Sequence, residues 1–327
     1  MSKDFKTYDQ QMQHLNTVKN INCDSTMHRG VLVKNGYFNL VNGYKEPFIT
    51  GKAASGNHIY ISGVDIEDIL TVKTFDDDLR NILFKYLSKV EEEIRVLIGY
   101  TFDYHNQKGG VSWEDVKAYD LVQNQILHVN NMIVSIQAEV AKSNNSYINH
   151  HNLQHGVLPT WVLLKSITFS NALQLLDKSC VNLKDSLCDL YDMKTSRGFS
   201  DYILLKGSLQ WIRIIRNSCA HNERVFDITT NGRIQSQYIY LLPPSYQINR
   251  DRHKRLIDLF VYLRYYLCDA EYIGILDEVQ ILLADLKNKT NQNSYNHIRS
   301  RMGIKDASHL DILKKTSKTV EYSKYLI

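Results

Sequence analysis

Proline is scarce in this chain, with only 4 among 327 residues. Proline interrupts helices because it lacks a backbone N–H and its ring clashes with the preceding turn. Few prolines and many long polar side chains therefore favour a helical protein. The chain also lacks an apolar run long enough to span a membrane, and its first residues contain no apolar signal-peptide core. These absences predict a soluble, cytoplasmic protein with no membrane contact.

Patterns that bind metals are also missing. The five cysteines are widely spaced and form no C-x-x-C pair, so the sequence indicates neither a zinc site nor a disulfide framework. His150, His151 and His155 are close in sequence, but they lie in an Asn-rich stretch without a nearby carboxylate. A solvated loop explains that stretch better than a metal site. We therefore expect no metal and no cofactor.

An excess of charge of one sign is absent too. The chain has 39 basic and 35 acidic residues, which gives a formal net charge of +4. A surface that binds nucleic acid must then be local. One candidate is the aromatic stretch 31–48, where Lys34, Tyr37 and Lys45 could stack on bases and follow phosphates. Packing of the aromatic rings at tight glycine turns is the alternative.

Apolar residues recur at three- and four-residue steps in several long stretches, which predicts helices. The expected helices cover 75–105, 114–142, 199–222 and 250–286, and a helical section begins at Ser62 or Asp65. A further helix opens at Pro159, and its apolar face starts with Trp161 and Leu164. The apolar stripe of the helix over 199–222 consists of Leu205, Leu209, Ile212, Ile215 and Cys219. We expect a loop at 143–156, a short strand at 58–63 and a strand pair around 226–242. The fold class is therefore mainly α with minor β elements. The predicted domains are an N-terminal extension (1–65), a helical domain (66–286) and a basic C-terminal helical tail (287–327).

One short stretch carries an unusual set of residues. The sequence RIIRNSCAHNERVF, residues 213–226, places His221 among three arginines at the end of an apolar helix. The R-x4-H spacing of Arg216 and His221 corresponds to about 140° around a helix, so their side chains do not share a face. Either the helix ends between them, or each residue meets a partner from another element or a second copy of the chain.

Histidine and arginine together suit cleavage of RNA by its own 2′-hydroxyl. Histidine transfers protons near neutral pH, and arginine offers a planar fork of donors to a phosphate. Fixed positive charge stabilises the more negative transition state without a metal ion. The bare spacing is a weak signal in a chain with 14 Arg and 12 His. A histidine at a helix C-terminus also interacts favourably with the helix dipole, so a structural role stays open.

A longer string narrows these alternatives. R-N-x-C-A-H-N-x-R, residues 216–224, resembles the signature of the Abi-like (AbiD/AbiF) abortive-infection family, which belongs to the HEPN superfamily of RNA-cleaving helical domains. Three other stretches resemble that family in the expected order: NGYFNLVNGYKEPF (35–48), VEEEIRVLIGYTF (90–102) and LPTWVLLKSITFSNALQLL (158–176). The last stretch departs from the family at one place, because relatives often have glycine near Ser170.

The resemblance implies a HEPN-type helical bundle with an N-terminal extension, which acts as a homodimeric endoribonuclease toxin in phage defence. Its partners would be substrate RNA and, in some relatives, a small RNA antitoxin. By this resemblance His221 transfers protons, Arg216 contacts the phosphate or supports the partner's site, and Asn217 positions them. A hydrogen bond at the helix end is the alternative role of Asn217. A non-catalytic protein that holds a structured RNA and a bundle that binds only proteins are the alternatives.

Other basic and aromatic residues extend the expected RNA surface. Arg95 follows Glu91 and Glu92 by about one helical turn, so it can form an ion pair or brace Arg216 as well as contact phosphate. Arg213 precedes Arg216 by one turn and Arg224 lies just past the helix. The expected RNA-binding residues are Arg213, Arg224, Arg95, Lys34, Tyr37 and Lys45.

Overall fold

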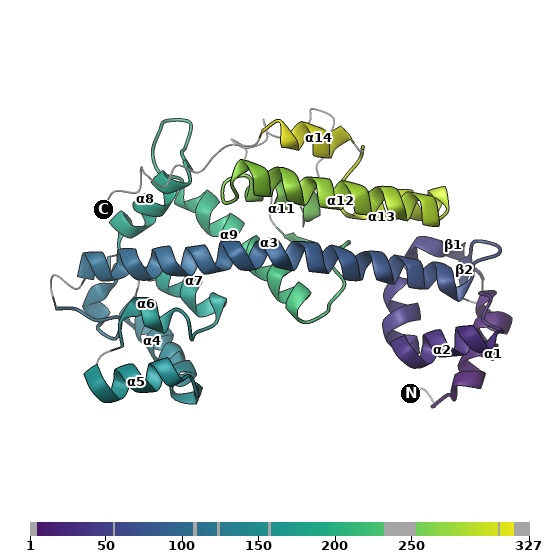
Figure 1. Cartoon of the computed structure of the whole chain (residues 1–327), viewed down its shortest axis with the longest axis horizontal. Coiled ribbons are helices and arrows are strands. Elements are labelled where there is room, and N and C mark those ends of the chain that lie inside the picture. Colours follow the sequence, from purple (N-terminus) through teal and green to yellow (C-terminus); the bar gives the residue numbers. More distant parts are fainter. Residues whose placement is uncertain are drawn as a thin grey trace.

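The structure is a computed structural model that describes residues 5–54, 56–106, 110–122, 125–155, 158–231, 253–306 and 308–316. The fold is mainly helical, as predicted, with two small two-stranded sheets. One long helix, α3 (Ile66–Asn106), runs through most of the molecule, and the other elements pack along it (Figure 1). A helix of this length spans about 60 Å, so α3 connects the two ends of the protein.

The start of α3 follows from local sequence signals. The Asp65 carboxylate accepts a hydrogen bond from the Glu67 amide, and Asp68 accepts one from the Asp65 amide. These contacts satisfy amides that the first turn of a helix leaves unpaired, and the acidic side chains complement the helix dipole. The sequence predicts a helical start at Ser62 or Asp65 and a long helix over 75–105. The structure joins both into one continuous helix.

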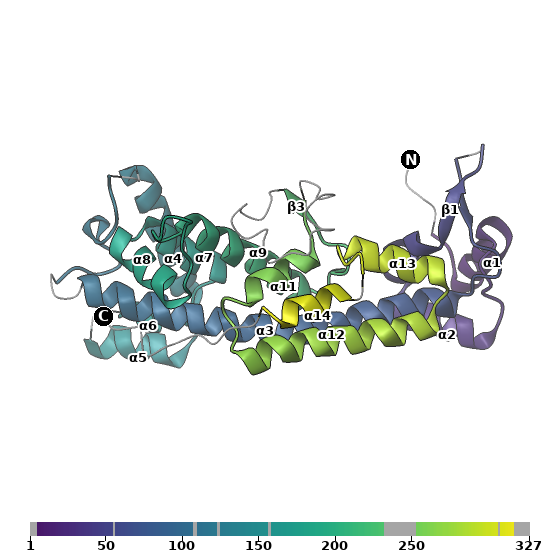
Figure 2. The same ribbon diagram turned by 90° about the horizontal axis from the view of Figure 1, so that it is seen from above.

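The N-terminal elements surround one end of α3 (Figures 1 and 2). The predicted strand at 58–63 is confirmed as one half of an antiparallel hairpin. Gly36 ends the second helix with a positive φ of 72°, and a π-helix follows it directly. In order, the elements are α1 (Tyr8–Lys19), α2 (Thr26–Asn35), the π-helix η1 (Phe38–Asn42), the 3-10 helix η2 (Glu46–Phe48), β1 (Ile49–Lys52) and β2 (His58–Tyr60).

Short helices cover the other end of α3, and here three expectations were wrong. The expected helix over 114–142 begins only at Ile126, after a 3-10 turn, and the expected loop over 143–156 contains a helix. The expected helix after Pro159 splits in two, because Thr168 caps a new helix by accepting a hydrogen bond from the Asn171 amide. The elements are η4 (Val116–Ala118), α4 (Ile126–Lys142), α5 (Ser146–His155), α6 (Thr160–Leu163), α7 (Phe169–Lys178) and α8 (Val181–Leu190).

The helix that carries the R-x4-H motif is α9 (Tyr202–Ala220), close to the predicted range of 199–222. Its predicted apolar stripe is buried against the rest of the protein, at Leu205, Leu209, Ile212, Ile215 and Cys219. After α9, β3 (Thr230–Asn231) pairs with β4 (His253–Lys254). Most of the strand pair expected around 226–242 lies outside the described residues.

The C-terminal helices return along α3. The predicted helix over 250–286 is interrupted between residues 263 and 269, which gives α11 (Leu256–Leu263) and α12 (Asp269–Lys289). Helix α12 lies beside α3, and two lysines of α3, Lys85 and Lys89, pair with glutamates of α12 at 2.8 and 2.6 Å. The expected tail contains α13 (Gln292–Arg301) and α14 (Ser308–Lys314).

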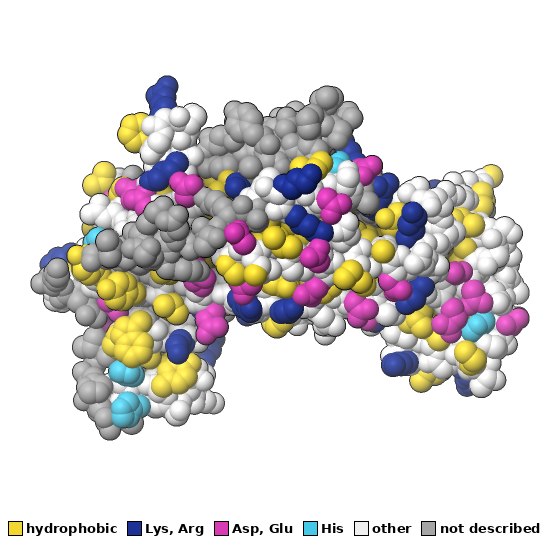
Figure 3. All heavy atoms as spheres, turned by 45° about the horizontal axis from the view of Figure 1, so that its top comes forward, with side chains coloured by type: hydrophobic (Ala, Val, Ile, Leu, Met, Phe, Trp, Pro, Cys, Tyr) yellow, Lys and Arg dark blue, Asp and Glu magenta, His cyan; other side chains and the backbone are white. Residues whose placement is uncertain are grey.

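Helix α13 packs against the N-terminal segment. The Ser294 hydroxyl donates a hydrogen bond to the Pro47 carbonyl at 3.1 Å, which ties α13 to η2. The domain boundaries at residues 65 and 286 stay a prediction. Basic and acidic side chains are interspersed on the face that Figure 3 shows, in agreement with the small net charge. Within the described residues, no helix combines the length and apolar character that crossing a membrane requires.

Candidate functional site

The last turn of α9 ends between the two residues of the motif. Helix α9 stops at Ala220, and His221 is its C-terminal cap. Asn222 has a positive φ of 55°, and the Glu223 amide donates a hydrogen bond to the Ser218 carbonyl at 2.9 Å. This arrangement closes the helix and satisfies its last carbonyls. Of the alternatives that the 140° separation leaves open, the structure shows that the helix ends between Arg216 and His221.

Arg216 lies on the side of α9 that faces α3. Its Nε forms an ion pair with the Glu91 Oε2 at 2.6 Å, and its guanidinium lies 5.7 Å from the centre of the Phe84 ring. Its Nη1 donates a hydrogen bond to the Asn217 Oδ1 at 3.2 Å. The Arg216 side chain is still 29% exposed. The guanidinium is therefore held in one orientation and remains accessible to a ligand.

The Glu91 carboxylate holds a second arginine from the same helix. Arg95 donates hydrogen bonds to the Glu91 Oε1 from Nε at 3.0 Å and from Nη2 at 2.7 Å. Arg95 also donates to the carbonyls of Leu164 and Ile167. These contacts make Arg95 a brace for Glu91 and, through it, for Arg216. Because its donors are used inside the protein, the geometry favours this role over the phosphate contact.

A buried carboxylate on α3 anchors the segment after His221. Asp76 is fully buried and accepts hydrogen bonds from the amides of Val225 and Phe226, at 3.1 and 2.9 Å. The Tyr44 hydroxyl and Arg80 Nη1 also donate to it, at 2.9 and 2.5 Å. Burial raises the pKa of Asp76, while Arg80 and the two amides oppose that rise. This network fixes the chain at Val225 and Phe226, which follow His221 by four and five residues.

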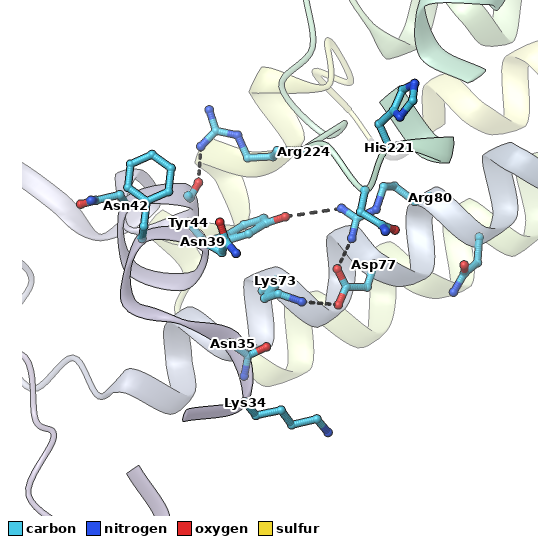
Figure 4. Close-up of a pocket in the computed structure, with 14 residues that line it drawn as sticks. Lys34, Asn35, Asn39, Asn42, Tyr44, Lys73, Asp77, Arg80, His221 and Arg224 are labelled. Atoms are coloured by element: carbon cyan, nitrogen blue, oxygen red, sulfur yellow. Dashed lines mark hydrogen bonds and ion pairs between the residues drawn. The ribbon is translucent and has the colours of Figure 1, made fainter. Parts of the chain in front are cut away.

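A large open cleft lies beside this network (Figure 4). It has a volume of about 960 Å³ and is walled by the end of α2, η1, α3 and the segment after α9. His221 is exposed, and Figure 4 shows its ring turned away from Arg80. The lining residues are Lys34, Asn35, Phe38, Asn39, Asn42, Gly43, Tyr44, Lys73, Asp77, Arg80, Asn81, His221, Asn222 and Arg224.

Three residues predicted from the sequence line this cleft: His221, Arg224 and Lys34. Arg224 pairs with Asp227 and donates a hydrogen bond to the carbonyl of Gly43, so it joins the motif segment to η1. Lys34 lies on the α2 wall and is exposed. Lys45 donates to Asn42 and lines a neighbouring cavity of about 640 Å³, which shares Asn42 and Arg224 with the cleft.

The remaining predicted residues lie elsewhere. Arg216, Asn217, Arg95 and Arg213 do not line the cleft. Arg213 donates to Gln210 and to the Ser170 hydroxyl, both at 3.0 Å. Tyr37 is half-buried at the start of η1, and burial raises its pKa to about 12, so packing describes it better than base contact. The roles of all these residues in RNA binding stay predictions.

Several functional candidates were missed by sequence reasoning. Glu91 and Asp76 hold the two ends of the motif segment, and Lys73, Asn39 and Asn81 line the cleft. Glu91 lies within VEEEIR, which indicates an ion pair with Arg95 but not the contact with Arg216. The other four carry no local pattern that distinguishes them from surface residues. Their positions depend on contacts between segments far apart in the chain.

The arrangement can bind an anion and move a proton beside it. His221 supplies an exposed imidazole, and four lysine or arginine side chains line the surrounding cleft. Lys73 and Arg80 pair with Asp77, Arg80 also pairs with Asp76, and Arg224 pairs with Asp227. Of these four side chains, Lys34 forms no ion pair with the described residues. Within the part of the chain that the structure describes, no group of three or more His, Cys, Asp or Glu side chains could hold a metal ion. Proton transfer and stabilisation of negative charge are the chemistry that these side chains offer.

A comparison with protein families matches residues 30–227 to the family described as Abi-like protein. The match covers more than half of the chain and includes η1, α3 and the whole R-x4-H motif. No curated protein and no solved structure matches the chain. The chain therefore belongs to the Abi-like protein family, which implies a role in abortive infection, a defence against phages.

Proposed function

We propose that this protein is a metal-independent HEPN-type endoribonuclease toxin that cuts cellular RNA in the cytoplasm during phage defence. The proposal rests on the exposure of the two side chains of the R-x4-H motif. His221 is exposed at the rim of a basic cleft, and Arg216 is oriented by Glu91 but remains 29% exposed. Both side chains therefore remain accessible to a phosphate.

The proposed chemistry uses the RNA itself as the nucleophile. His221 takes the proton of a ribose 2′-hydroxyl, whose oxygen attacks the adjacent phosphorus, and the bond to the 5′-oxygen of the next nucleotide breaks. A protonated imidazole gives the leaving oxygen its proton. Arg216 stabilises the extra negative charge on the phosphate oxygens. The products are a 2′,3′-cyclic phosphate and a 5′-hydroxyl, so atoms and charge balance without an ion.

One imidazole does not readily serve as base and acid on opposite sides of the same phosphorus. A second copy of the chain, related by a two-fold axis, would supply a second His221 and a second Arg216. We therefore propose that the active form is a homodimer in which both subunits contribute side chains to one shared site. Because the shared site needs both imidazoles, dimers that combine one wild-type subunit with one His221→Ala subunit should not cut RNA. Cleavage by such mixed dimers at about half of the wild-type rate would contradict the shared site.

The decisive test is incubation of the purified protein with total RNA in EDTA, followed by mapping of the cut ends. We expect cyclic-phosphate and 5′-hydroxyl ends from wild type and no cuts from His221→Ala. Growth arrest at equal expression should show the same difference. If both proteins arrest growth equally and neither cuts RNA, the non-catalytic RNA-binding alternative replaces the nuclease. A small RNA antitoxin is a separate proposal, and RNA that co-purifies with His221→Ala would support it.

A further inference from the structure

The cleft beside His221 is unusually rich in side-chain amides. Five of its fourteen lining residues are asparagines: Asn35, Asn39, Asn42, Asn81 and Asn222. A groove that only follows the phosphate backbone needs lysine and arginine, because its ligand is a row of negative charges. Amides offer a donor and an acceptor in one plane, which suits the edges of nucleic-acid bases. The composition of the walls therefore indicates a site that recognises more than charge.

Two of these amides are available from opposite walls. Asn39 lies on η1 and Asn81 lies on α3, and both side chains are exposed. Among the described residues neither side chain has a hydrogen-bond partner. By contrast, Asn42 accepts from Lys45 and Asn35 donates to the Val31 carbonyl. Asn39 and Asn81 can therefore bind a ligand without first breaking an internal hydrogen bond.

The wall that carries Asn39 has an uncommon backbone. η1 is a π-helix, a conformation that is rare and often found at functional sites. Phe38, at its first position, is 76% exposed and lines the cleft. The carbonyl of Gly43 at the end of η1 accepts from Arg224. This wall is thus fastened to the segment that follows His221 while it presents an aromatic ring and an amide to solvent.

We propose that the cleft is a base-recognition subsite for one unpaired nucleotide of the RNA, adjacent to the linkage that is cut. Asn39 and Asn81 would bind the edge of the base, Phe38 would stack on its face, and Lys34 would contact a phosphate. A base inside a duplex hides this edge, so the subsite selects single-stranded RNA. The open cleft, with a volume of about 960 Å³, has room for a base together with its sugar and phosphate.

This inference rests on the proposed function, and its test compares cleavage of single-stranded oligonucleotides that differ in one base. We expect wild type to prefer one base by about tenfold in kcat/KM, which is the size of discrimination that amide contacts provide. In Asn39→Ala and Asn81→Ala this preference should fall to near unity. Phe38→Ala should raise KM for all four oligonucleotides alike. The matched control is Asn131→Ala, at an exposed position on α4 outside the cleft, which should retain the wild-type preference.

The outcomes separate the two proposals. Equal cleavage of all four oligonucleotides by wild type, or an unchanged preference in both asparagine variants, would overturn the subsite and leave the nuclease intact. If wild type cuts no RNA, the proposed function fails, and binding of the same oligonucleotides to His221→Ala decides the subsite by itself. Fluorescence anisotropy should then show a base preference that Asn39→Ala and Asn81→Ala remove, and its persistence in them would refute the subsite. Thermal melting confirms that each variant is folded.

Discussion

Replacing Glu91 by alanine tests how α3 holds the Arg216 end of the motif. Glu91 is 5% exposed, receives two hydrogen bonds from Arg95 and pairs with Arg216 at 2.6 Å. Removing one partner of a buried ion pair costs about 3–5 kcal/mol. Arg95 keeps the carbonyls of Leu164 and Ile167, and Arg216 can gain water. We therefore expect a loss at the lower end of the range, about 3 kcal/mol.

Arg216→Ala is the matched comparison for Glu91→Ala. It leaves Glu91 with its two hydrogen bonds from Arg95, and the side chain that it removes is 29% exposed. A partly exposed ion pair contributes about 1 kcal/mol or less, so we expect a small loss of stability. Cleavage should nevertheless disappear, because the guanidinium would no longer stabilise the phosphate.

Urea unfolding followed by circular dichroism measures the stability of both variants, and cleavage of one RNA measures their activity. Glu91→Ala should lose more stability, whereas Arg216→Ala should lose more activity. Were Arg216→Ala to destabilise the protein as much as Glu91→Ala, the main role of Arg216 would be to attach α9 to α3. The separation of a structural carboxylate from a catalytic guanidinium would then be wrong.

Three further predictions concern other positions. Gly99→Ala should lower the free energy of unfolding by about 1–3 kcal/mol, because the new Cβ would lie 2.8 Å from the Trp161 Cα. This clash outweighs the higher helix propensity of alanine, which is worth about 1 kcal/mol. A higher melting temperature of the variant would contradict the prediction. Burial raises the pKa of Cys219 to about 12, so iodoacetamide at pH 8 should modify it only after unfolding, as mass spectrometry can show. Burial lowers the pKa of His297 below its ordinary value of 6.5, so the unfolded chain binds more protons as pH falls through that value. Stability should then decrease on acidification below pH 6.5, and less steeply in His297→Gln; equal slopes would refute the assignment.

The sequence predicted those elements that are specified by residues close together in the chain. The acids after Asp65 indicate the start of α3, and the apolar period over 199–222 indicates the buried face of α9. The alternating stretch at 58–63 indicates the hairpin strand. The brace between Glu91 and Arg95 belongs to this group because the two residues lie one helical turn apart.

The elements that were missed depend on distant partners. The stretch 143–156 is polar, yet α5 forms there because Ile148 is buried and His151 packs against the Trp161 ring at 5.7 Å. Trp161 itself is 52% exposed, so it does not belong to the continuous apolar face that the sequence indicated. Tertiary packing outweighs local propensity in such segments.

The candidate site also has one part that the sequence predicts and another that depends on distant contacts. The motif that contains Arg216 and His221 can be recognised in the sequence, but the residues that position this segment are on α3. Glu91 contacts Arg216, and Asp76 contacts the amides of Val225 and Phe226, about 150 residues further along the chain. No spacing rule connects positions so far apart. The amide-rich lining of the cleft cannot be read from the sequence either, since Asn39 and Asn81 line the same cleft only because η1 packs beside α3.

The order of these contacts explains how a single helix sets the geometry of the motif. Glu91 meets the start of the motif segment and Asp76 meets its end, so residues 216–226 run antiparallel to α3. The two acids are about 22 Å apart along the helix axis. His221 lies between the two fixed points, at the end of α9, where the chain is no longer bound by helical geometry. A change at either acid should therefore move His221 relative to Arg216, although neither acid belongs to the motif.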